Sequence, residues 1–456
     1  MIFRRYLLLG VVGLLILGFV INYYFVQLLI ENSKSISKLS KFSSSADGRE
    51  IDFKSYTSSS RGDVLEFVQE KVLKEVRVLP SRYFKLDPDY KLILESIFSE
   101  LEVREIAHNE IPHIVKEWPS ARIIVPPHAP ELGAVIESLR SLKIVKADNV
   151  KHGTQLKLMI TFENDLKAVF KPQWYNRTTK LDGPVYFGKD RHNAEVVAFY
   201  LSLLLSMRVA PIALIRKLDL SEEVEKNATP ELLSTLYKED ENTCFYGICH
   251  YCSPEDPICG TNDVLEGALM LWLPSKWKLA KHRNPWQRTY SKNRNALWEV
   301  DMKYCEKIKQ SKTYSSRSSS RLLNLIDVAI FDFLIDNGDR HHYETFQGNY
   351  DNPAILLIDN GKSFGNPDKD HIDILAPLYQ CCMISKSTWD RLKLFSGGSL
   401  SYSLKKLLQR ESLMADVQSV MTNDHLEAID RRLLTVFAIV EICLKENPYS
   451  TGVIIG

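Results

Sequence analysis

Three acidic residues in one stretch have the types and the spacing that phosphoryl transfer requires. Asp339 follows an apolar run at residues 322–335, Glu344 comes five residues later, and Asp359 ends a second apolar run at residues 354–358. Transfer of a phosphoryl group needs a base for the acceptor hydroxyl and carboxylates for the cations that bridge the phosphates. We therefore predict that Asp339 is the base and that Asp359 is a metal ligand.

The spacing of these residues is that of a kinase catalytic loop followed by a metal-binding loop. Glu344 stands where ordinary protein kinases have an asparagine, so it adds a negative charge, and its role stays open. The alternative is that both motifs are plain turns, because Asp-Asn and Asn-Gly pairs are common turn formers. Residues elsewhere in the chain must decide between the two interpretations.

A β-hairpin is predicted upstream of these motifs. Apolar residues alternate over residues 156–162, a turn follows at 163–165, and a second strand is expected at 166–172. Lys171 ends the second strand, where a kinase places the lysine that contacts nucleotide phosphates. A surface lysine at a strand end would look the same. No glycine-rich loop precedes Lys171, and Gln155 is the best substitute for covering the phosphates.

A helix and a hinge strand are predicted next. Asp190 or Asn193 is a candidate N-cap for a helix that carries Glu195 and the apolar residues 196–205. A helical glutamate that pairs with the strand lysine is typical of kinases. A short apolar strand of Met270, Leu271, Trp272 and Leu273 suits a hinge beside an adenine. Lysine, glutamate, hinge, base and metal ligand thus occur in kinase order.

Composition limits the other classes of function. The chain has 456 residues, 45% of them hydrophobic, which fits two or three domains or one bilobal enzyme with additions. With 58 basic and 57 acidic residues the formal net charge is +1. The chain has no large net positive charge that would attract nucleic acid, so nucleic acid is not an expected partner.

The N-terminal region predicts a membrane anchor. Residues 6–30 carry no charge, and at about 1.5 Å per residue they are long enough to cross a bilayer core of about 30 Å. A cleavable signal peptide would be shorter, so we expect an uncleaved anchor after a cytosolic tail at residues 1–5. The Ser- and Lys-rich residues 31–63 predict a flexible stem. Helical periodicity predicts that residues 64–150 form helices outside the catalytic core.

The glycosylation sequons and the cysteines predict the cellular compartment of the catalytic region. Sequons at Asn176 and Asn227, together with an even number of cysteines, suit an oxidising and glycosylating lumen. Two alternatives stay open: the first four cysteines bind zinc with His250, or Cys249 and Cys252 form a redox-active pair. The eight cysteines are Cys244, Cys249, Cys252, Cys259, Cys305, Cys381, Cys382 and Cys443.

Six motifs resemble the atypical secretory-pathway kinases of the Golgi. They are DRHNAE at 190–195, CFYGICHYC at 244–252, NPWQRTY at 284–290, DRHHYE at 339–344, LIDNGKSFG at 357–365 and LYQCC at 378–382. The resemblance covers roughly residues 151–444. It implies an α+β fold, an atypical bilobal protein-kinase-like fold with N-terminal helical additions. It also implies an ATP-dependent phosphotransferase that uses manganese, with magnesium as an alternative, and a single-pass type II protein of the Golgi membrane whose catalytic domain is luminal.

The resemblance assigns roles to matching residues. It implies that Asp339 is the catalytic aspartate, Asp359 a metal and nucleotide ligand, and Asp190 a manganese ligand. Glu195 orients the strand lysine, and Glu344 lies on the nucleotide side.

The remaining implied contacts concern the nucleotide and the disulfides. Lys171 and Gln155 contact the phosphates, and Met270 to Leu273 hold the adenine. The implied disulfides are Cys244–Cys259, Cys249–Cys252, Cys305–Cys381 and Cys382–Cys443. The implied domains are an N-lobe with hinge at residues 151–274, a C-lobe at 275–446 and a tail at 447–456.

The acceptor is predicted from a narrower resemblance. SFGNP at 363–367, LAPLYQCC at 375–382 and Ser387-Thr388-Trp389 resemble the branch of this family that phosphorylates the 2-hydroxyl of xylose in the glycosaminoglycan–protein linkage region of proteoglycans. The expected partners are a xylose–galactose linker, the membrane, and related kinases in homo- or hetero-oligomers. The alternatives are a secretory-pathway protein serine kinase of the Golgi casein kinase type and an inactive kinase-like binding partner. Retention of Lys171, Asp339 and Asp359 argues against the inactive partner.

Aromatic residues are candidates for walls around a sugar ring. Tyr379, Trp389 and either His341 or His342 lie near the motifs in sequence, although each also fits a core position. The basic loop at residues 276–294 is either a sugar platform or a packed insertion. Its aromatic residues are Trp277, Trp286 and Tyr290.

Overall fold

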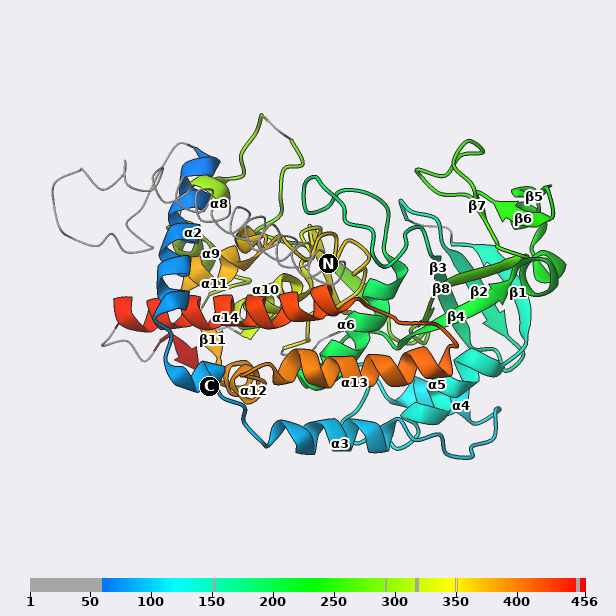
Figure 1. The fold of residues 1–456 in the computed structure, drawn as a ribbon, viewed down its shortest axis with the longest axis horizontal. Helices are drawn as coiled ribbons and strands as arrows, with labels where there is room; N and C mark the ends of the chain where they lie inside the picture. Colours follow the sequence, from blue (N-terminus) through cyan, green and yellow to red (C-terminus); the bar gives the residue numbers. More distant parts are fainter. Residues whose placement is uncertain are drawn as a thin grey trace, which may run out of the picture. The chain divides into compact units, whose positions relative to one another are not determined.

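A five-stranded antiparallel sheet carries the predicted lysine (Figure 1). The computed structural model describes residues 60–150, 153–291, 293–315, 320–348, 350, 352–447 and 452–456. In spatial order the strands are β1 (Ile144–Asn149), β2 (Leu158–Phe162), β3 (Lys167–Pro172), β8 (Val264–Leu271) and β4 (Ala213–Asp219). The predicted hairpin is confirmed, because β2 pairs with β3 across a turn in which Asp165 has a φ of +65°.

One strand of this sheet differs from the sequence expectation. Residues 144–149, expected within the helical segment 64–150, form β1 and pair with β2. A register shift between Ile144 and Lys146 interrupts the pairing. A bulge of this kind breaks the period of two that identifies a strand from sequence. The strand is therefore recognisable only from its pairing.

Helices make up the rest of the segment before the sheet, as predicted. They are α2 (Arg61–Arg77), α3 (Tyr90–Glu100), α4 (Ile111–Glu117) and α5 (Leu132–Ser141), with a short turn η2 (Ser81–Phe84). α2 packs along α14 (Asn423–Glu446) and buries Val64, Val68 and Val72. α5 packs on β4, and α3 contacts α6 (His192–Leu204). The segment thus supports both the sheet and the helical part of the fold.

α6 is buried at every position. It packs across β4 and β8, which its almost wholly apolar sequence requires because a helix without a polar face must be covered on all sides. Short elements follow in the chain: η3 (Leu220–Val224), η4 (Glu225–Asn227), α7 (Pro230–Leu233) and a small sheet of β5 (Leu236–Glu239), β6 (Asn242–Phe245) and β7 (Ile258–Cys259).

The second half of the described chain is mainly helical (Figure 1). α10 packs against η6, α11 and α14, and it ends at a turn where Asp336 has a φ of +58°. The predicted tail at 447–456 contributes β12 (Ile454–Ile455), which pairs in parallel with β11 (Ile384–Ser385). The other elements are β9 (Leu279–Arg283), α8 (Leu297–Val300), α9 (Tyr304–Lys309), α10 (Ser320–Ile335), β10 (His342–Phe346), η6 (Ile372–Leu375), α11 (Ala376–Cys381), α12 (Lys386–Leu394) and α13 (Ser399–Met414).

Several predictions concern residues that the structure does not describe. The anchor at residues 6–30 and almost all of the stem at 31–63 lie outside the described residues, and Arg61, Gly62 and Asp63 of the stem belong to α2. Among the helices that are described, none is both long enough and apolar enough to cross a membrane.

Candidate active site

Lys171 lies at the centre of a buried ion cluster. β3 carries it, and 5% of the residue is exposed. Its Nζ lies 2.6 Å from Asp359 Oδ1, 2.7 Å from Glu195 Oε1 and 3.2 Å from Asp190 Oδ2. Burial alone favours the neutral amine, but the Asp359, Glu195 and Asp190 carboxylates together raise the pKa of Lys171 well above its ordinary value. Lys171 is thus a fixed positive charge, and four residues predicted from sequence meet there.

Glu195 ties this cluster to the loop at residues 358–363. We call it the metal-binding loop after the role predicted for Asp359. It lies in the first turn of α6, and 2% of it is exposed. The Asn360 backbone N–H donates to Glu195 Oε1 over 2.9 Å, and Asn360 Nδ2 donates to Glu195 Oε2 over 3.0 Å. Both carboxylate oxygens are therefore engaged, which fixes the side chain beside Lys171. Asn360 was not predicted, although it stands next to the predicted metal ligand.

Asp190 faces the cluster from the residue before the helix cap. Its Oδ1 lies 3.5 Å from Lys362 Nζ, so it contacts a second lysine. Gly361 makes this position possible, because a Cβ on Gly361 would lie 2.6 Å from Asp190 Cγ. The Arg191 backbone N–H also donates to the Gly361 carbonyl over 2.7 Å.

The predicted N-cap of α6 is wrong. Arg191 occupies the cap position, and it forms no side-chain cap hydrogen bond. Asp190 is turned instead toward Lys171 and Lys362, and Asn193 Nδ2 donates to the Val420 carbonyl over 2.8 Å. Stronger partners elsewhere in the fold take both side chains away from the helix end.

Asp359 presents an open carboxylate to the site. Its side chain is 70% exposed, and its backbone has a φ of +63°. Lys171 is the main cause of a pKa far below the ordinary value for Asp359, so the carboxylate is ionised at neutral pH. Asp190 and Asp359 supply carboxylate oxygens, the kind of donor that manganese and magnesium prefer. The donor set fits a divalent cation.

Arg340 joins the metal-binding loop to the loop at residues 337–341. We call the latter the base loop after the role predicted for Asp339. Its guanidinium binds the buried Asp332 of α10 through Nε over 2.5 Å and Nη2 over 2.7 Å. Nη2 also donates to Asn360 Oδ1 over 2.8 Å, and Nη1 donates to the Ile358 carbonyl over 2.8 Å. This bidentate ion pair fixes residues 339–341 relative to Asp359.

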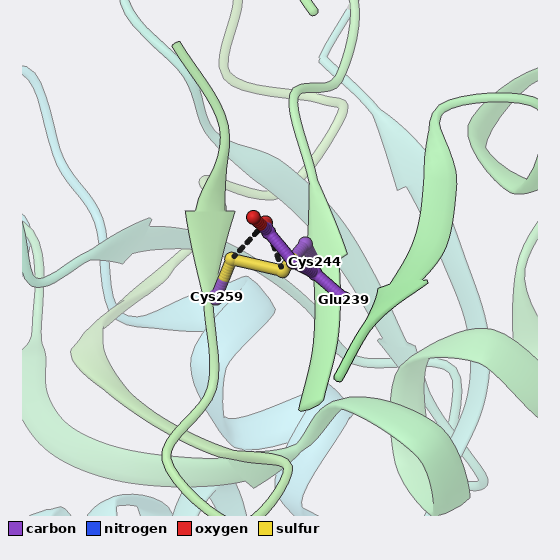
Figure 2. A group of neighbouring side chains, drawn as sticks. All are labelled: Glu239, Cys244 and Cys259. Carbon is purple, nitrogen blue, oxygen red and sulfur yellow. Dashed lines mark hydrogen bonds between the residues drawn. A yellow bond between two sulfur atoms is a disulfide. The ribbon is translucent and has the colours of Figure 1, made fainter. Parts of the chain in front are cut away.

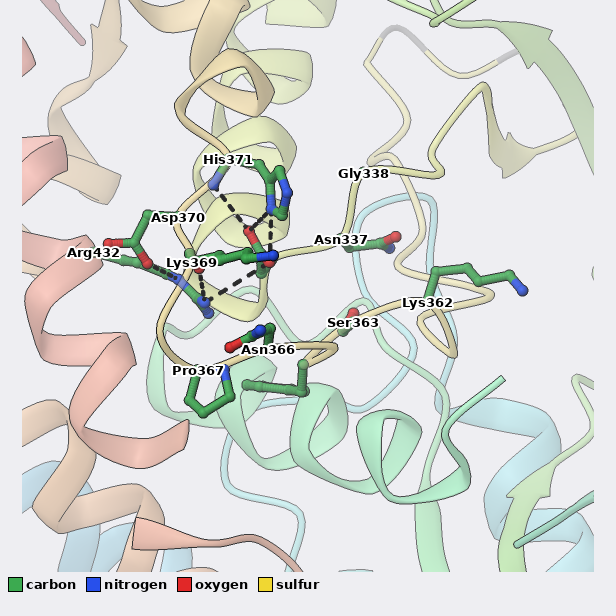
Figure 3. A network of polar contacts seen from close by, with 12 residues as sticks. Asn337, Gly338, Lys362, Ser363, Asn366, Pro367, Lys369, Asp370, His371 and Arg432 are labelled. Carbon is green, nitrogen blue, oxygen red and sulfur yellow. Dashed lines mark hydrogen bonds and ion pairs between the residues drawn. The ribbon is translucent and has the colours of Figure 1, made fainter. Parts of the chain in front are cut away.

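A second polar network holds the end of α10, from which the base loop starts (Figure 3). His371 Nδ1 lies 3.0 Å from Asp336 Oδ2 at the end of α10. Arg432 of α14, which is fully buried, binds Asp370 Oδ1 through Nε over 2.8 Å and donates to the Lys369 carbonyl over 2.9 Å. The network links α10, the segment before η6, and α14.

Asp339 lies half-buried on the loop after α10. The Asp339 backbone N–H donates to Asn337 Oδ1 over 3.2 Å. Tyr290 donates its hydroxyl hydrogen to Asp339 Oδ1. His341 Nδ1 lies 3.6 Å from the same carboxylate, and hydrogen bonding to Asp339 raises the pKa of His341. Asp339 therefore already accepts a hydrogen bond from a hydroxyl, as a base for an acceptor alcohol must.

Two cavities flank these residues. A cavity of about 180 Å³ with a mainly apolar lining lies beside Lys171 and Asp359. Met270 to Leu273 contribute to it, as predicted for an adenine pocket. Its other lining residues are Lys157, Val169, Pro211, Leu279 and Ile358.

The second cavity, of about 300 Å³, includes Tyr290 and extends toward α2. Arg61, Leu65 and Gln69 line it from α2, and Val185 and Tyr186 line it from the segment before Asp190. Its remaining lining residues are Pro184, Arg288, Ser291, Asp370, His371, Ile372 and Asp373.

Glu344 lies on β10, half-buried, and forms an isolated β-bridge with Leu356 in the segment that leads into Asp359. The Leu356 backbone N–H donates to the Glu344 carbonyl over 2.9 Å. Burial raises the pKa of Glu344, and Arg340 opposes that shift. The residue therefore borders the site, on the side of the metal-binding loop.

Gln155 is not brought to the ion cluster by any hydrogen bond among the described residues. It lies half-buried in a bend before β2. Lys157, which was not predicted, lines the apolar cavity beside Lys171 and contributes to the low pKa of Asp359. Lys157 stands between apolar residues of the predicted strand, and no motif singled it out.

All eight cysteines form disulfides, in the implied pairing: Cys244–Cys259, Cys249–Cys252, Cys305–Cys381 and Cys382–Cys443. This excludes the zinc alternative for the first four. Figure 2 shows Glu239 beside Cys244 and Cys259, with its Oε2 3.6 Å and 3.8 Å from the two sulfurs. Disulfide sulfurs are not thiolates, so this group is no metal site.

The candidate aromatic walls divide into core and site residues. Tyr379 and Trp389 are 2% and 4% exposed and belong to the core. In the loop at 276–294, Trp286 is buried and donates to Gln380 Oε1 over 2.8 Å, and Trp277 packs on Phe346. Tyr290 and His341 contact Asp339. The sequence pattern did not separate the core residues from the site residues, because aromatic side chains occur in both places.

Comparisons with known proteins agree with this geometry. The family model described as "Golgi casein kinase, C-terminal, Fam20" matches residues 112–451. The human glycosaminoglycan xylosylkinase is 46% identical over 73% of this chain and 80% of its own length. The human extracellular serine/threonine protein kinase FAM20C is 41% identical over 70% of this chain and 55% of its own length.

Two solved structures are also similar. The structure of hydra Fam20 with sugar superposes with a TM-score of 0.71 at 41% identity, over 76% of this chain and 97% of that one. The Golgi casein kinase with Mn/ADP bound superposes with a TM-score of 0.70 at 27% identity, over 90% of this chain and 96% of that one.

Proposed function

The chain belongs to the Fam20 family, and we propose on that premise that it phosphorylates the 2-hydroxyl of xylose in the glycosaminoglycan–protein linkage region of proteoglycans. The phosphotransferase activity rests on one observation above all. Lys171, Glu195, Asp190 and Asp359 form a single ion cluster at the edge of an apolar cavity, and Asp339 lies on the adjoining loop held by Arg340.

The nucleotide substrate is ATP. Its adenine fits the apolar cavity formed by Met270 to Leu273, and the lysine lies where its phosphates would meet a fixed positive charge. Asp190 and Asp359 would hold manganese or magnesium, which neutralises charge on the phosphates when bound. A related Golgi casein kinase has Mn/ADP bound, which supports manganese for this chain.

Asp339 performs the proton transfer. It accepts the proton of the acceptor hydroxyl while the acceptor oxygen forms a bond to the γ-phosphorus of ATP. The bond between that phosphorus and the bridging oxygen breaks, and ADP leaves with the electron pair. Lys171 stabilises charge on the phosphates throughout. The acceptor oxygen replaces the Tyr290 hydroxyl as the hydrogen-bond partner of Asp339.

The cavity of about 300 Å³ beside Tyr290 is the proposed acceptor site. Tyr290, Tyr186 and His371 offer ring faces and polar tips in one cavity, which suits a sugar ring better than an extended peptide. Relatives point the same way, because a xylosylkinase is 46% identical and the sugar-bound hydra Fam20 is 41% identical. The alternative is a serine kinase of the Golgi casein kinase type, to which FAM20C, 41% identical, lends support.

We also propose that the protein is anchored in the Golgi membrane with its catalytic region in the lumen. Four disulfides among the described residues suit an oxidising compartment. Asn176 is exposed, as a glycosylated sequon must be, whereas Asn227 is partly buried and donates to the Glu223 carbonyl. The uncharged residues 6–30 would provide the anchor.

An assay with two acceptors tests the proposed function. Purified full-length protein is given ATP and manganese with either a galactosyl-xyloside or an acidic serine-rich peptide. We expect phosphate transfer to the sugar, and we expect Asp339→Asn to lose it. Efficient transfer to the peptide but not to the sugar would assign the chain to the protein-kinase branch instead.

A further inference from the structure

A third cavity, of about 290 Å³, lies away from the ion cluster, between α10 and α12. We call it the α10–α12 cavity. Its walls come from the loop after α4, the turn after α6, helix α10, the segment before Leu356, and helix α12. Half of its lining is apolar: Ile123, Leu205, Met207, Val209, Val328, Ala354 and Ile355. A largely apolar cavity with a few converging polar groups is the usual form of a ligand site.

Arg391 of α12 gives this cavity its unusual feature. The side chain is partly buried, and its Nη1 has no hydrogen-bond partner and no access to solvent. Among the described residues, no carboxylate lies within ion-pair distance of Arg391. Burial and the neighbouring Arg208 both lower the pKa of Arg391, and no acidic group opposes them. A partly buried guanidinium without a charge partner is partly desolvated without compensation, and an anion in the cavity would offset that cost.

The other charged groups of the cavity leave a net positive charge. Arg122 also lines it, is exposed, and donates from Nη1 to the Asn352 carbonyl over 3.4 Å. Asp327 of α10 is the acidic lining residue, and it accepts hydrogen bonds from Ser385 Oγ over 3.2 Å and 3.3 Å. Burial raises the pKa of Asp327 to about 6. Among the described residues, two guanidinium groups and one carboxylate with a raised pKa therefore line the cavity. Asp351 lies outside the described residues.

We propose that the α10–α12 cavity binds a small oxyanion, a phosphate or sulfate group, through the guanidinium groups of Arg391 and Arg122. A planar guanidinium donates two parallel hydrogen bonds to such a group, and Arg391, which lines the cavity, donates no side-chain hydrogen bond to another described residue. Ser387 and Thr388 add hydroxyls to the same wall. The apolar half of the cavity suits the carbon body of a molecule that carries the oxyanion.

This cavity shares walls with elements of the active site without including its residues. Ile355 lies four residues before Asp359, and residues 205–209 follow the helix that begins near Glu195. The Leu357 backbone N–H donates to the Val209 carbonyl over 3.0 Å and joins the two segments. Phosphate and sulfate also suit Lys171, so an experiment must keep the nucleotide site filled.

Calorimetric titration of the purified full-length protein with sodium sulfate tests the proposal. Saturating ADP and magnesium fill the nucleotide site, and sodium chloride keeps the ionic strength constant. We expect one sulfate site in the wild type, with affinity reduced at least about tenfold in Arg391→Met, as loss of a charge-assisted hydrogen bond predicts. Arg122→Met should weaken binding as well. Asp327→Asn should strengthen it, because the variant removes the one negative charge.

Lys393→Met is the matched control. It removes a positive charge from the same helix, but Lys393 pairs with Asp390 over 3.0 Å and does not line the cavity. We expect it to bind sulfate as the wild type does. The absence of a sulfate site in the wild type, or a site that Arg391→Met and Arg122→Met leave unchanged, would overturn the proposal.

A second set of titrations distinguishes a free phosphate or sulfate ion from an oxyanion that is attached to a sugar. The same titration uses inorganic phosphate, a sulfated monosaccharide and the unsulfated monosaccharide. Equal affinities for free and sugar-linked sulfate support a free oxyanion. Tighter binding of the sulfated sugar, dependent on Arg391, supports an oxyanion carried on a sugar. Binding of the neutral sugar equal to that of the sulfated sugar would contradict a role for charge.

Discussion

At the scale of single residues, the functions proposed for Asp339 and Asp359 should be separable, and this gives the first prediction. Asp359→Ala should abolish metal-dependent nucleotide binding, because it removes an open carboxylate held next to Lys171. Asp339→Ala should bind nucleotide as the wild type does but should transfer no phosphate. Thermal-shift titrations with nucleotide and manganese measure binding, and an acceptor assay measures transfer.

Asp368→Ala is the control for these variants. Its carboxylate pairs with Lys180 at the surface, outside the site, so we expect wild-type binding and transfer. Nucleotide binding by Asp359→Ala as tight as that of the wild type would contradict the assignment of Asp359.

A second residue-scale prediction concerns the metal-binding loop. Gly361→Ala places a Cβ 2.6 Å from Asp190 Cγ and must displace that carboxylate. We expect manganese affinity, measured through nucleotide binding, to fall at least about tenfold, the usual cost of displacing a ligand or its support. Gly365→Ala is the matched control, because its Cβ would meet nothing closer than 3.6 Å. Equal manganese affinities for the two variants would show that Asp190 holds no metal.

Single residues were predictable where motif spacing constrains chemistry. Lys171, Glu195, Asp190 and Asp359 meet as predicted. Asn360, Arg340 and Lys362 were missed, although each lies within or beside a predicted motif. Their roles depend on how two loops from distant parts of the sequence approach one another, and spacing within one motif carries no information on that.

At the scale of elements, a buried ion pair fixes the loop that carries Tyr290. Arg288 binds Asp373 of η6, and both side chains are buried. Although burial opposes it, Arg288 lowers the pKa of Asp373 to about 2. Because an unfolded aspartate has a pKa of about 3.9, this pair stabilises the fold above that pH. The contribution is lost as the pH falls from about 4 toward about 2.

Asp373→Asn should therefore destabilise the protein at pH 7 by about 3–5 kcal/mol, since it leaves Arg288 buried without a charge partner. The difference from wild type should shrink as the pH falls through this range. Urea unfolding at several pH values measures both effects, and Asp368→Asn serves as the surface control. A difference that stays constant from pH 7 to pH 2 would contradict the ion-pair explanation.

Elements with strong periodicity were predictable, and those defined by pairing were not. The β2–β3 hairpin and α6 follow from alternation and from a continuous apolar run. β1 was missed because a bulge interrupts its register, and the cap of α6 was wrong because Asp190 and Asn193 have tertiary partners. Local patterns do not reveal such competing contacts.

At the scale of the whole molecule, disulfides that close long loops should dominate covalent stabilisation. Cys382–Cys443 joins residues 61 apart, whereas Cys249–Cys252 joins residues three apart. Loop-closure entropy predicts that a double Cys→Ser variant of the first pair loses about 4 kcal/mol and that the same change in the second pair loses less than about 2 kcal/mol. Denaturant unfolding measures both losses. Equal losses would show that closure of the long loop is not the main term.

The order of chemical groups along the chain indicated a kinase, and the resemblance of six motifs to the Golgi kinases predicted the whole-molecule fold. Lysine, glutamate, hinge, base and metal ligand occur in the sequence order that a bilobal kinase-like fold requires, and the Fam20 structures have that fold. The packing of α2 along α14, with Arg61 and Leu65 lining the cavity beside Tyr290, was not predictable. An amphipathic pattern shows that a helix is covered on one face but not by which element.

The position of the transferred phosphate tests the central claim most directly. The full-length protein, ATP and manganese are incubated with a galactosyl-xyloside, and the product is analysed by phosphorus and proton NMR. We predict one phosphate per acceptor, coupled to the proton at carbon 2 of xylose, formed by the wild type and not by Asp339→Asn. A phosphate on the galactose, or on another xylose hydroxyl, would contradict the proposed function.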